Sequence, residues 1–249
     1  MKRLFLLLIL VPIPAQAAFT LKVSGSGGSS DGSNITVTLD TTGSDLILVG
    51  ITRYGGASFC SFSDSRSNSY TNVGNSNSPD FTAFQQFFYV TGNAATISGT
   101  SHSFTCSGSG GDQPALNIIT FSGANTALGT MVLDQMGTAG SNSSASLAVS
   151  ITTPIEANEV VVAVGGWNSN SNFSSFTGTG FTVSNTVAPS GTHFGTSMVY
   201  SIQTTAAAAT ATLNLSTATQ VAATMASFRN LPVAGGPKPG TLVTLGVGK

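Results

Sequence analysis

The stretch Phe19 to Leu39, FTLKVSGSGGSSDGSNITVTL, decides the fold because a similar stretch returns without a gap as Met131 to Ile151, MVLDQMGTAGSNSSASLAVSI. Each copy reads as an extended segment, a Gly/Ser-rich loop and a second extended segment with alternating apolar residues. The segments after each copy also recur in the same order. We therefore predict that the chain contains one β unit written twice.

Further extended segments occur in both copies. Leu46 to Ile51 and Val160 to Val164 are apolar on both faces, which predicts a central strand in each copy. Three more pairs of segments correspond: Phe84 to Val90 with Met198 to Ile202, His102 to Cys106 with Ala211 to Leu215, and Leu116 to Phe121 with Ala222 to Phe228. Short strands at this spacing are typical of a sandwich. We expect an all-β fold of two tandem antiparallel β-sandwich repeats, either separate or fused into one larger jelly-roll-like sandwich.

The segments outside the repeats predict the location of the protein. Residues 1–17 read as a secretory signal peptide, with Lys2 and Arg3 before an apolar run and an Ala15-Gln16-Ala17 cleavage site. The alternative is a retained N-terminal anchor. The repeats then occupy 18–130 and 131–231. We expect a secreted or cell-surface protein with no membrane association after cleavage.

A Pro/Gly-rich tail, 232–249, comes after the second repeat and contains the short apolar segment Thr241 to Leu245. Such a segment can add a strand to an exposed sheet edge of a neighbouring molecule. We therefore expect self-association through the tail. The alternative is a disordered terminus.

The composition excludes some partners. Only 7% of the residues are charged, against about 25% in a typical globular protein. No cluster of Lys or Arg comes after the predicted leader, so the chain lacks the electrostatic footprint of a nucleic-acid-binding protein. No cofactor is expected.

The only cysteines, Cys60 and Cys106, both lie in the first repeat. Cys60 alternates with Phe62, and Cys106 alternates with Phe104, so both thiols point the way core residues point. A disulfide is the natural interpretation in a secreted chain. Two free buried thiols are the alternative. A metal site is less favoured because no His lies at ligand spacing.

No catalytic constellation is visible in the sequence. His102 and His193 have no Ser, Cys or carboxylate nearby in a catalytic pattern, which favours surface or strand-end histidines. The glutamates Glu156 and Glu159 lie in one turn and cannot straddle a cleft. The loop aspartates are turn-forming candidates that could also help bind Ca²⁺: Asp64, Asp80 and Asp112. We expect no catalytic residues and no metal site, and hence no enzyme.

Two aromatic residues are the strongest ligand-binding candidates. Tyr54 and Trp167 end the two central strands and align when Asp45 is matched to Asn158. An aromatic ring there can offer a flat face to a sugar, and Asn168 and Asn170 would add amide groups beside Trp167. The alternative is that both rings cap the core.

Turn chemistry gives the chain a resemblance to a known group. Asp64-Ser65, Asn68 and Tyr70-Thr71 form a D-S-x-x-N-x-Y-T hairpin, and Phe121-Ser122-Gly123 and Phe228-Arg229 close the two copies. This arrangement, over roughly Asp45 to Asn230, resembles uncharacterised secreted and phage-associated β-sandwich proteins. The resemblance implies a fold and no activity. We expect a non-enzymatic extracellular structural or adhesion protein of a cell surface or virion. The alternative is a carbohydrate-binding module, for which a glycan would be the partner.

Overall fold

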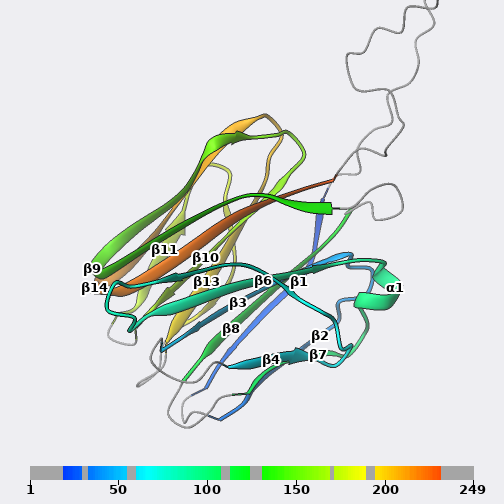
Figure 1. Ribbon diagram of the computed structural model, residues 1–249, viewed down its shortest axis with the longest axis horizontal. Coiled ribbons are helices and arrows are strands. Elements are labelled where there is room, and N and C mark those ends of the chain that lie inside the picture. The colour runs from blue at the N-terminus through cyan, green and yellow to red at the C-terminus, as the bar shows by residue number, and fades with distance from the viewer. Residues whose placement is uncertain are drawn as a thin grey trace, which may run out of the picture.

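The computed structural model of the protein describes residues 19–29, 33–54, 60–107, 113–123, 131–168, 171–188 and 194–230 (Figure 1). The predicted signal peptide and tail lie outside these residues, as do Asp112, Asn170 and His193. Within the described residues no helix has the length and apolar character needed to span a membrane.

The first repeat contains a five-stranded and a three-stranded antiparallel sheet. The larger sheet has the order β1-β8-β3-β6-β5 and the smaller one β2-β7-β4. The elements are β1 (Thr20–Gly28), β2 (Ile35–Leu39), β3 (Leu46–Arg53), β4 (Ser61–Asp64), β5 (Thr71–Asn77), β6 (Phe84–Thr91), α1 (Ala94–Ile97), β7 (His102–Ser107) and β8 (Ala115–Ser122).

The second repeat pairs its strands in the same order. Its elements are β9 (Met131–Ile155), β10 (Val160–Trp167), β11 (Phe173–Thr177), β12 (Thr182–Val187), β13 (Gly195–Ile202) and β14 (Ala207–Asn230). The long strands β9 and β14 pair with each other and each takes the place of two strands of the first repeat. The C-terminal part of β14 also pairs with β10, and its N-terminal part pairs with β11. The predicted all-β, antiparallel sandwich fold is confirmed.

The register of the central strands corrects the alignment of the two copies by one residue. Leu46 of β3 pairs with Phe121, and Val160 of β10 pairs with Phe228. Leu46 therefore corresponds to Val160, which makes Trp167 the counterpart of Arg53 and not of Tyr54. The slip arose because a strand that is apolar on both faces has no alternation to fix its phase.

The same comparison shifts the alignment of β7. Cys106 lies opposite Ile35, and Leu213 lies opposite Leu147, so Cys106 corresponds to Leu213 rather than to Leu215. A shift of two residues keeps every side chain on the same face, so the predicted inward direction of the β7 side chains is unaffected.

Three apolar cores lie between four layers of sheet. Two of them fill the individual sandwiches. The third lies between the five-stranded sheet of the first repeat and the part of the six-stranded sheet of the second repeat that is centred on β10. It takes buried residues from both repeats: Phe19, Leu46, Leu48, Val73, Phe87, Ile119, Phe121, Val160, Val162, Val164, Met198, Ala226 and Phe228. The repeats are thus two sandwiches that share one continuous body (Figure 1).

The contacts across the shared core are reciprocal. Tyr89 of the first repeat packs on Phe228 of the second with ring centroids 5.2 Å apart, while Phe121 packs on Tyr200 at 5.5 Å. Tyr89 and Tyr200 occupy equivalent positions, as do Phe121 and Phe228. An interface in which a patch meets its own counterpart is isologous. The two repeats are therefore related by a pseudo-two-fold axis.

Candidate functional site

A buried carboxylate, that of Asp64, accepts several hydrogen bonds where β4 ends and β7 begins in the first repeat. Asp64 ends β4 and begins the D-S-x-x-N-x-Y turn, called the Asp64–Tyr70 turn below. The predicted hairpin is corrected here, because β4 pairs with β7 and β5 pairs with β6, so the turn connects the two sheets of the first repeat. Its Oδ1 accepts hydrogen bonds from the backbone N–H groups of Arg66 and Asn68, both at 3.0 Å. Its Oδ2 accepts from Asn68 Nδ2 at 2.7 Å and from Tyr70 Oη at 2.8 Å. His102 Nε2, from the first residue of β7, completes the set at 2.9 Å from Oδ2.

Asp64, Asn68, Tyr70 and His102 together form a polar hub, and their contacts fix the charge of the Asp64 carboxylate. Burial by itself would raise the pKa of the Asp64 carboxyl, but the hydrogen bonds from His102, Asn68 and Tyr70 outweigh burial and hold that pKa well below its usual range. Burial, and next the Asp64 charge, raise the pKa of the Tyr70 hydroxyl. Asp64 is therefore ionised at neutral pH, while Tyr70 keeps its proton.

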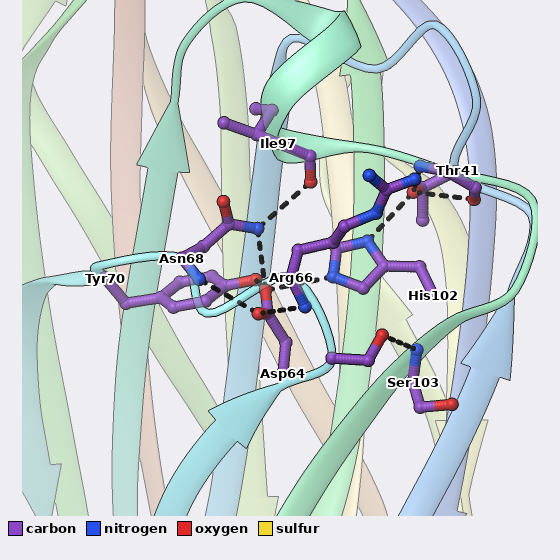
Figure 2. Close-up of polar contacts among 10 residues, drawn as sticks. Thr41, Asp64, Arg66, Asn68, Tyr70, Ile97, His102 and Ser103 are labelled. Atoms are coloured by element: carbon purple, nitrogen blue, oxygen red, sulfur yellow. Dashed lines mark hydrogen bonds and ion pairs between the residues drawn. The ribbon is translucent and has the colours of Figure 1, made fainter.

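His102 extends the hub to a hydroxyl. Its Nδ1 lies 3.0 Å from Thr41 Oγ1, so a carboxylate, an imidazole and a hydroxyl lie in series (Figure 2). This order resembles the relay of nucleophilic hydrolases. The Thr41 side chain is fully buried, however, and its Oγ1 also accepts from the Gly99 N–H at 3.0 Å. The hydroxyl therefore joins the loop before β3 to the loop before β7 and offers no exposed nucleophile.

Of the two alternatives predicted for His102, a surface or a strand-end histidine, the structure has the strand-end one. The residue does begin a strand, but its side chain is fully buried between Asp64 and Thr41. Sequence distance hid this arrangement, because β7 is brought beside β4 only when the sheet forms. The one signal available was the D-S-x-x-N-x-Y turn, whose polar side chains need a partner when buried.

A shallow pocket of about 360 Å³ lies beside the hub, between the Asp64–Tyr70 turn and α1. Its lining residues are Thr42, Gly43, Arg66, Ala94, Ala95, Ser98, Gly99 and Thr100. Arg66 is the only charged residue among them. The Asn68 amide donates to the Ile97 carbonyl at 3.0 Å, which fastens the Asp64–Tyr70 turn to the end of α1. The Asn93 side chain caps the start of α1 by accepting from Ala95 N at 2.9 Å.

The described residues of the second repeat hold no equivalent of this site. Register places Gly178 at the position of Asp64 and Ala209 at the position of His102. Phe181 takes the position of Tyr70, because the residue after each lies opposite an equivalent tyrosine. The turn between β13 and β14, which the structure describes in full, also lacks a helix. The hub and the pocket therefore belong to the first repeat.

The predicted disulfide between Cys60 and Cys106 is present, with Cα atoms 5.5 Å apart. Both residues are buried and belong to the core of the first sandwich. The bond ties the residue before β4 to β7, so it fixes the start of the strand whose last residue is Asp64. A stable disulfide is typical of an oxidising, extracellular-type environment.

The structure separates the predicted ligand-binding aromatics. Tyr54 is 46% exposed, but Trp167 is fully buried. The Trp167 indole donates to the Ser171 carbonyl at 3.0 Å and stacks on Phe173, with centroids 5.8 Å apart. The interpretation of Trp167 as a ligand-facing ring is thus corrected, because its true counterpart is the inward-facing Arg53. Asn168 lies next to Trp167 in sequence but bonds Gln220 through its side chain at 3.2 Å.

Metal ligation and known relatives give no further guide. In the part of the chain that the structure describes, no three His, Cys, Asp or Glu side chains group as metal ligands. A scan against protein-family models, a search of curated proteins and a search of solved structures found no match. The resemblance to secreted and phage-associated β-sandwich proteins stays a prediction.

Proposed function

We propose that this protein is a non-enzymatic extracellular structural or adhesion protein of a cell surface or virion. The observation that carries the proposal is the shared core, which joins the two repeats into one body through fully buried residues such as Leu48 and Val162. Such a body is suited to holding a binding surface at a fixed distance and orientation. The carboxylate–imidazole–hydroxyl series ends on a buried, bonded threonine, which supports a role without catalysis.

The extracellular part of the proposal rests on two features. The buried disulfide suits an oxidising compartment, and residues 1–17 have the character of a signal peptide. Expression with the native leader tests it. We expect the mature protein outside the cytoplasm with Cys60 and Cys106 oxidised, as measured by mass spectrometry before and after alkylation. Protein retained inside the cell with two alkylatable thiols would contradict this part.

The adhesion role is tested on purified, oxidised protein. We expect negative-stain images to show regular assemblies, or the protein to adsorb to intact cells in a saturable manner. Monomeric particles together with no saturable adsorption to any cell type tested would contradict the proposal.

Self-association through the tail is a separate part of this proposal. A truncation after Leu231 leaves every described strand in place. Light scattering of the truncated and full-length proteins over the same concentrations should give a higher mass for the full-length protein. Equal masses at every concentration would remove the tail from the proposal.

A carbohydrate-binding module is the second candidate function. The pocket beside α1 and the half-exposed Tyr54 favour it. A glycan array is the direct test: reproducible binding to one glycan class supports this role, and a blank array favours the structural role.

A further inference from the structure

We propose that the pocket between α1 and the Asp64–Tyr70 turn binds the carboxylate of an acidic sugar through Arg66. The inference rests on the proposed extracellular binding role and names the ligand class and the residue that recognises it. It is carried by the pocket itself and by an uncompensated guanidinium in it. In the described part of the second repeat the turn equivalent to α1 has no helix, and the arginine, Arg229, is paired with carboxylates.

Arg66 is held in place from its backbone outward. Its N–H donates to Asp64 Oδ1 at 3.0 Å, so the hub fixes the start of the side chain. Figure 2 shows the Arg66 side chain extending from the Asp64–Tyr70 turn toward Thr41. The guanidinium lies so close to Gly99 that a Cβ at that position would collide with it. A residue larger than glycine would therefore force the Arg66 guanidinium to shift.

The Arg66 charge has no partner within the described residues, in which the guanidinium makes no hydrogen bond or ion pair. Asp40, the carboxylate two residues before the pocket residue Thr42, is engaged elsewhere. The side chain and backbone of Thr42 donate to it, the latter at 3.0 Å, and Lys22 lies nearby. These contacts, the Thr42 side chain first, hold the pKa of Asp40 below its usual range. Arg66 is thus the charge that a ligand would neutralise.

The remaining lining fits a sugar better than a bare anion. A carboxylate matches the planar fork of a guanidinium and forms two parallel hydrogen bonds. Ala94 and Ala95 offer methyl groups to the C–H face of a ring, and the exposed Thr100 hydroxyl can bond a ring hydroxyl. A volume of about 360 Å³ suits one monosaccharide. The ligand class that fits the pocket is thus a uronic-acid-type sugar at the end of a glycan.

The experiment compares methyl glucuronide with methyl glucoside, followed by amide chemical shifts of the oxidised mature protein. The two probes differ only in whether the ring carries a carboxylate. We expect methyl glucuronide to shift the amides of Gly43, Gly99 and Thr100 and to bind at least about 10-fold more tightly, the scale of one charge-assisted hydrogen bond. Arg66→Ala should abolish the difference between the probes, and Arg66→Lys should retain part of it.

Two further variants separate recognition from folding. Gly99→Ala leaves the arginine in the chain but displaces it, so it should weaken methyl glucuronide binding as Arg66→Ala does. Arg229→Ala removes the same charge from the second repeat, where the side chain bridges Asp134 at 3.1 Å and Glu156 at 3.2 Å, and it should leave binding unchanged. Thermal unfolding shows whether Arg66→Ala still folds. If it does not, the Gly99→Ala and Arg66→Lys titrations decide.

Equal affinity for the two probes, or unchanged binding by a folded Arg66→Ala protein, would overturn the proposal. So would sulfate or an acidic peptide that shifts the same amides and binds as tightly as methyl glucuronide, because the pocket would then select charge and not a sugar. Adsorption of Arg66→Ala protein to cells is measured in parallel. Adsorption that persists while the probes fail removes the acidic sugar and leaves the adhesion role standing.

Discussion

The two repeats have the same strand order, but they differ in the residues at the positions of Asp64, Tyr70 and His102, which are polar in the first repeat and apolar in the second. The first holds Asp64, His102 and Tyr70 in one buried polar hub; the second has Gly178, Ala209 and Phe181 at those positions. Both versions fold into the same pair of sheets. The difference teaches that strand order does not depend on the chemistry of the hub, which is free to serve another purpose.

The hub holds the Asp64–Tyr70 turn in position. Burying an ionised carboxylate has a large desolvation cost, and apolar residues of similar volume are often at least as stabilising. The second repeat adopts the apolar solution. In the first repeat the hub anchors the backbone of Arg66 and, through Asn68, the end of α1. Polar contacts have defined directions, so they position a pocket in a way that apolar packing does not.

The largest effect is expected where the repeats are alike. Phe121→Ala and Phe228→Ala each remove a fully buried ring from the shared core, and each should lower the free energy of unfolding by about 3–5 kcal/mol. Because the positions are equivalent across the pseudo-two-fold axis, the two losses should agree within about 1 kcal/mol. Urea unfolding measures both. A loss at only one position would show that the interface is not reciprocal in energy.

The next effect is confined to the first repeat. Replacing Cys60 and Cys106 with alanine opens a loop whose ends are 46 residues apart, which in the chain-entropy model costs about 4 kcal/mol. Reduction of the wild-type protein should give a similar loss in urea unfolding. The alanine pair itself should not respond to reductant. Leu213→Ala, at the position equivalent to Cys106, is the matched variant, and the stability it loses relative to wild type should be the same with and without reductant. An alanine pair as stable as oxidised wild type would contradict the expectation.

Asp64→Asn tests the hub itself. The asparagine keeps one acceptor oxygen, but its NH2 group replaces the other, so one side of the former carboxylate faces hydrogen-bond donors with a donor. We expect a loss of about 3 kcal/mol at pH 7. The contribution of Asp64 is present above the ordinary carboxyl pKa and is lost as pH falls through its lowered folded pKa. Urea unfolding from pH 7 to pH 2 should therefore show a smaller acid-induced loss in the variant. Parallel acid curves would contradict the charged hub.

The comparison is sharpened by transplanting the apolar solution. The triple variant Asp64→Gly, His102→Ala and Tyr70→Phe copies the second repeat. We expect it to lose less stability than the three single variants added together, because the His102 and Tyr70 groups are removed together with the carboxylate that they bond, whereas Asp64→Gly alone leaves both of them buried without it. Urea unfolding of all four variants measures the difference. Strict additivity would show that the three residues do not act as one network.

The smallest effect concerns Glu159, whose counterpart in the first repeat is Asp45. Asp45 Oδ2 accepts from Gly123 N at 3.0 Å, whereas both Glu159 carboxylate oxygens are buried without a hydrogen bond. Burial raises the pKa of Glu159, and the Asp134 charge adds to the shift. Ser227 and Arg229 oppose the shift, although neither meets hydrogen-bond geometry to Glu159.

A raised carboxyl pKa favours the protonated form in the folded state, so stability falls as pH rises through the unfolded value and levels off above the folded one. Glu159→Gln should remove that slope and stabilise the protein by about 1 kcal/mol at pH 7. Thermal unfolding at pH 4 and pH 7 measures it. A variant less stable than wild type at pH 7 would contradict this account.

Alternation and repetition were enough to predict the sandwich, the doubled unit and the disulfide. Cys60 and Cys106 could be paired from sequence because each alternates with a phenylalanine that marks the core face. Trp167 could not be placed, since its strand is apolar on both faces and carries no phase. The pairing of Asp64 with His102 was invisible because it depends on which strands become neighbours.

The pseudo-two-fold axis also gives the molecule a direction. Thr20 pairs with Ser122 and Asn230 pairs with Met131, so the described chain enters and leaves at one end of the body, the end where Phe121 and Phe228 meet their tyrosines. The α1 pocket lies at this same end, since α1 comes after Thr91, the partner of Leu46. A molecule tethered by either terminus would thus face its support with the pocket and turn Tyr54 outward.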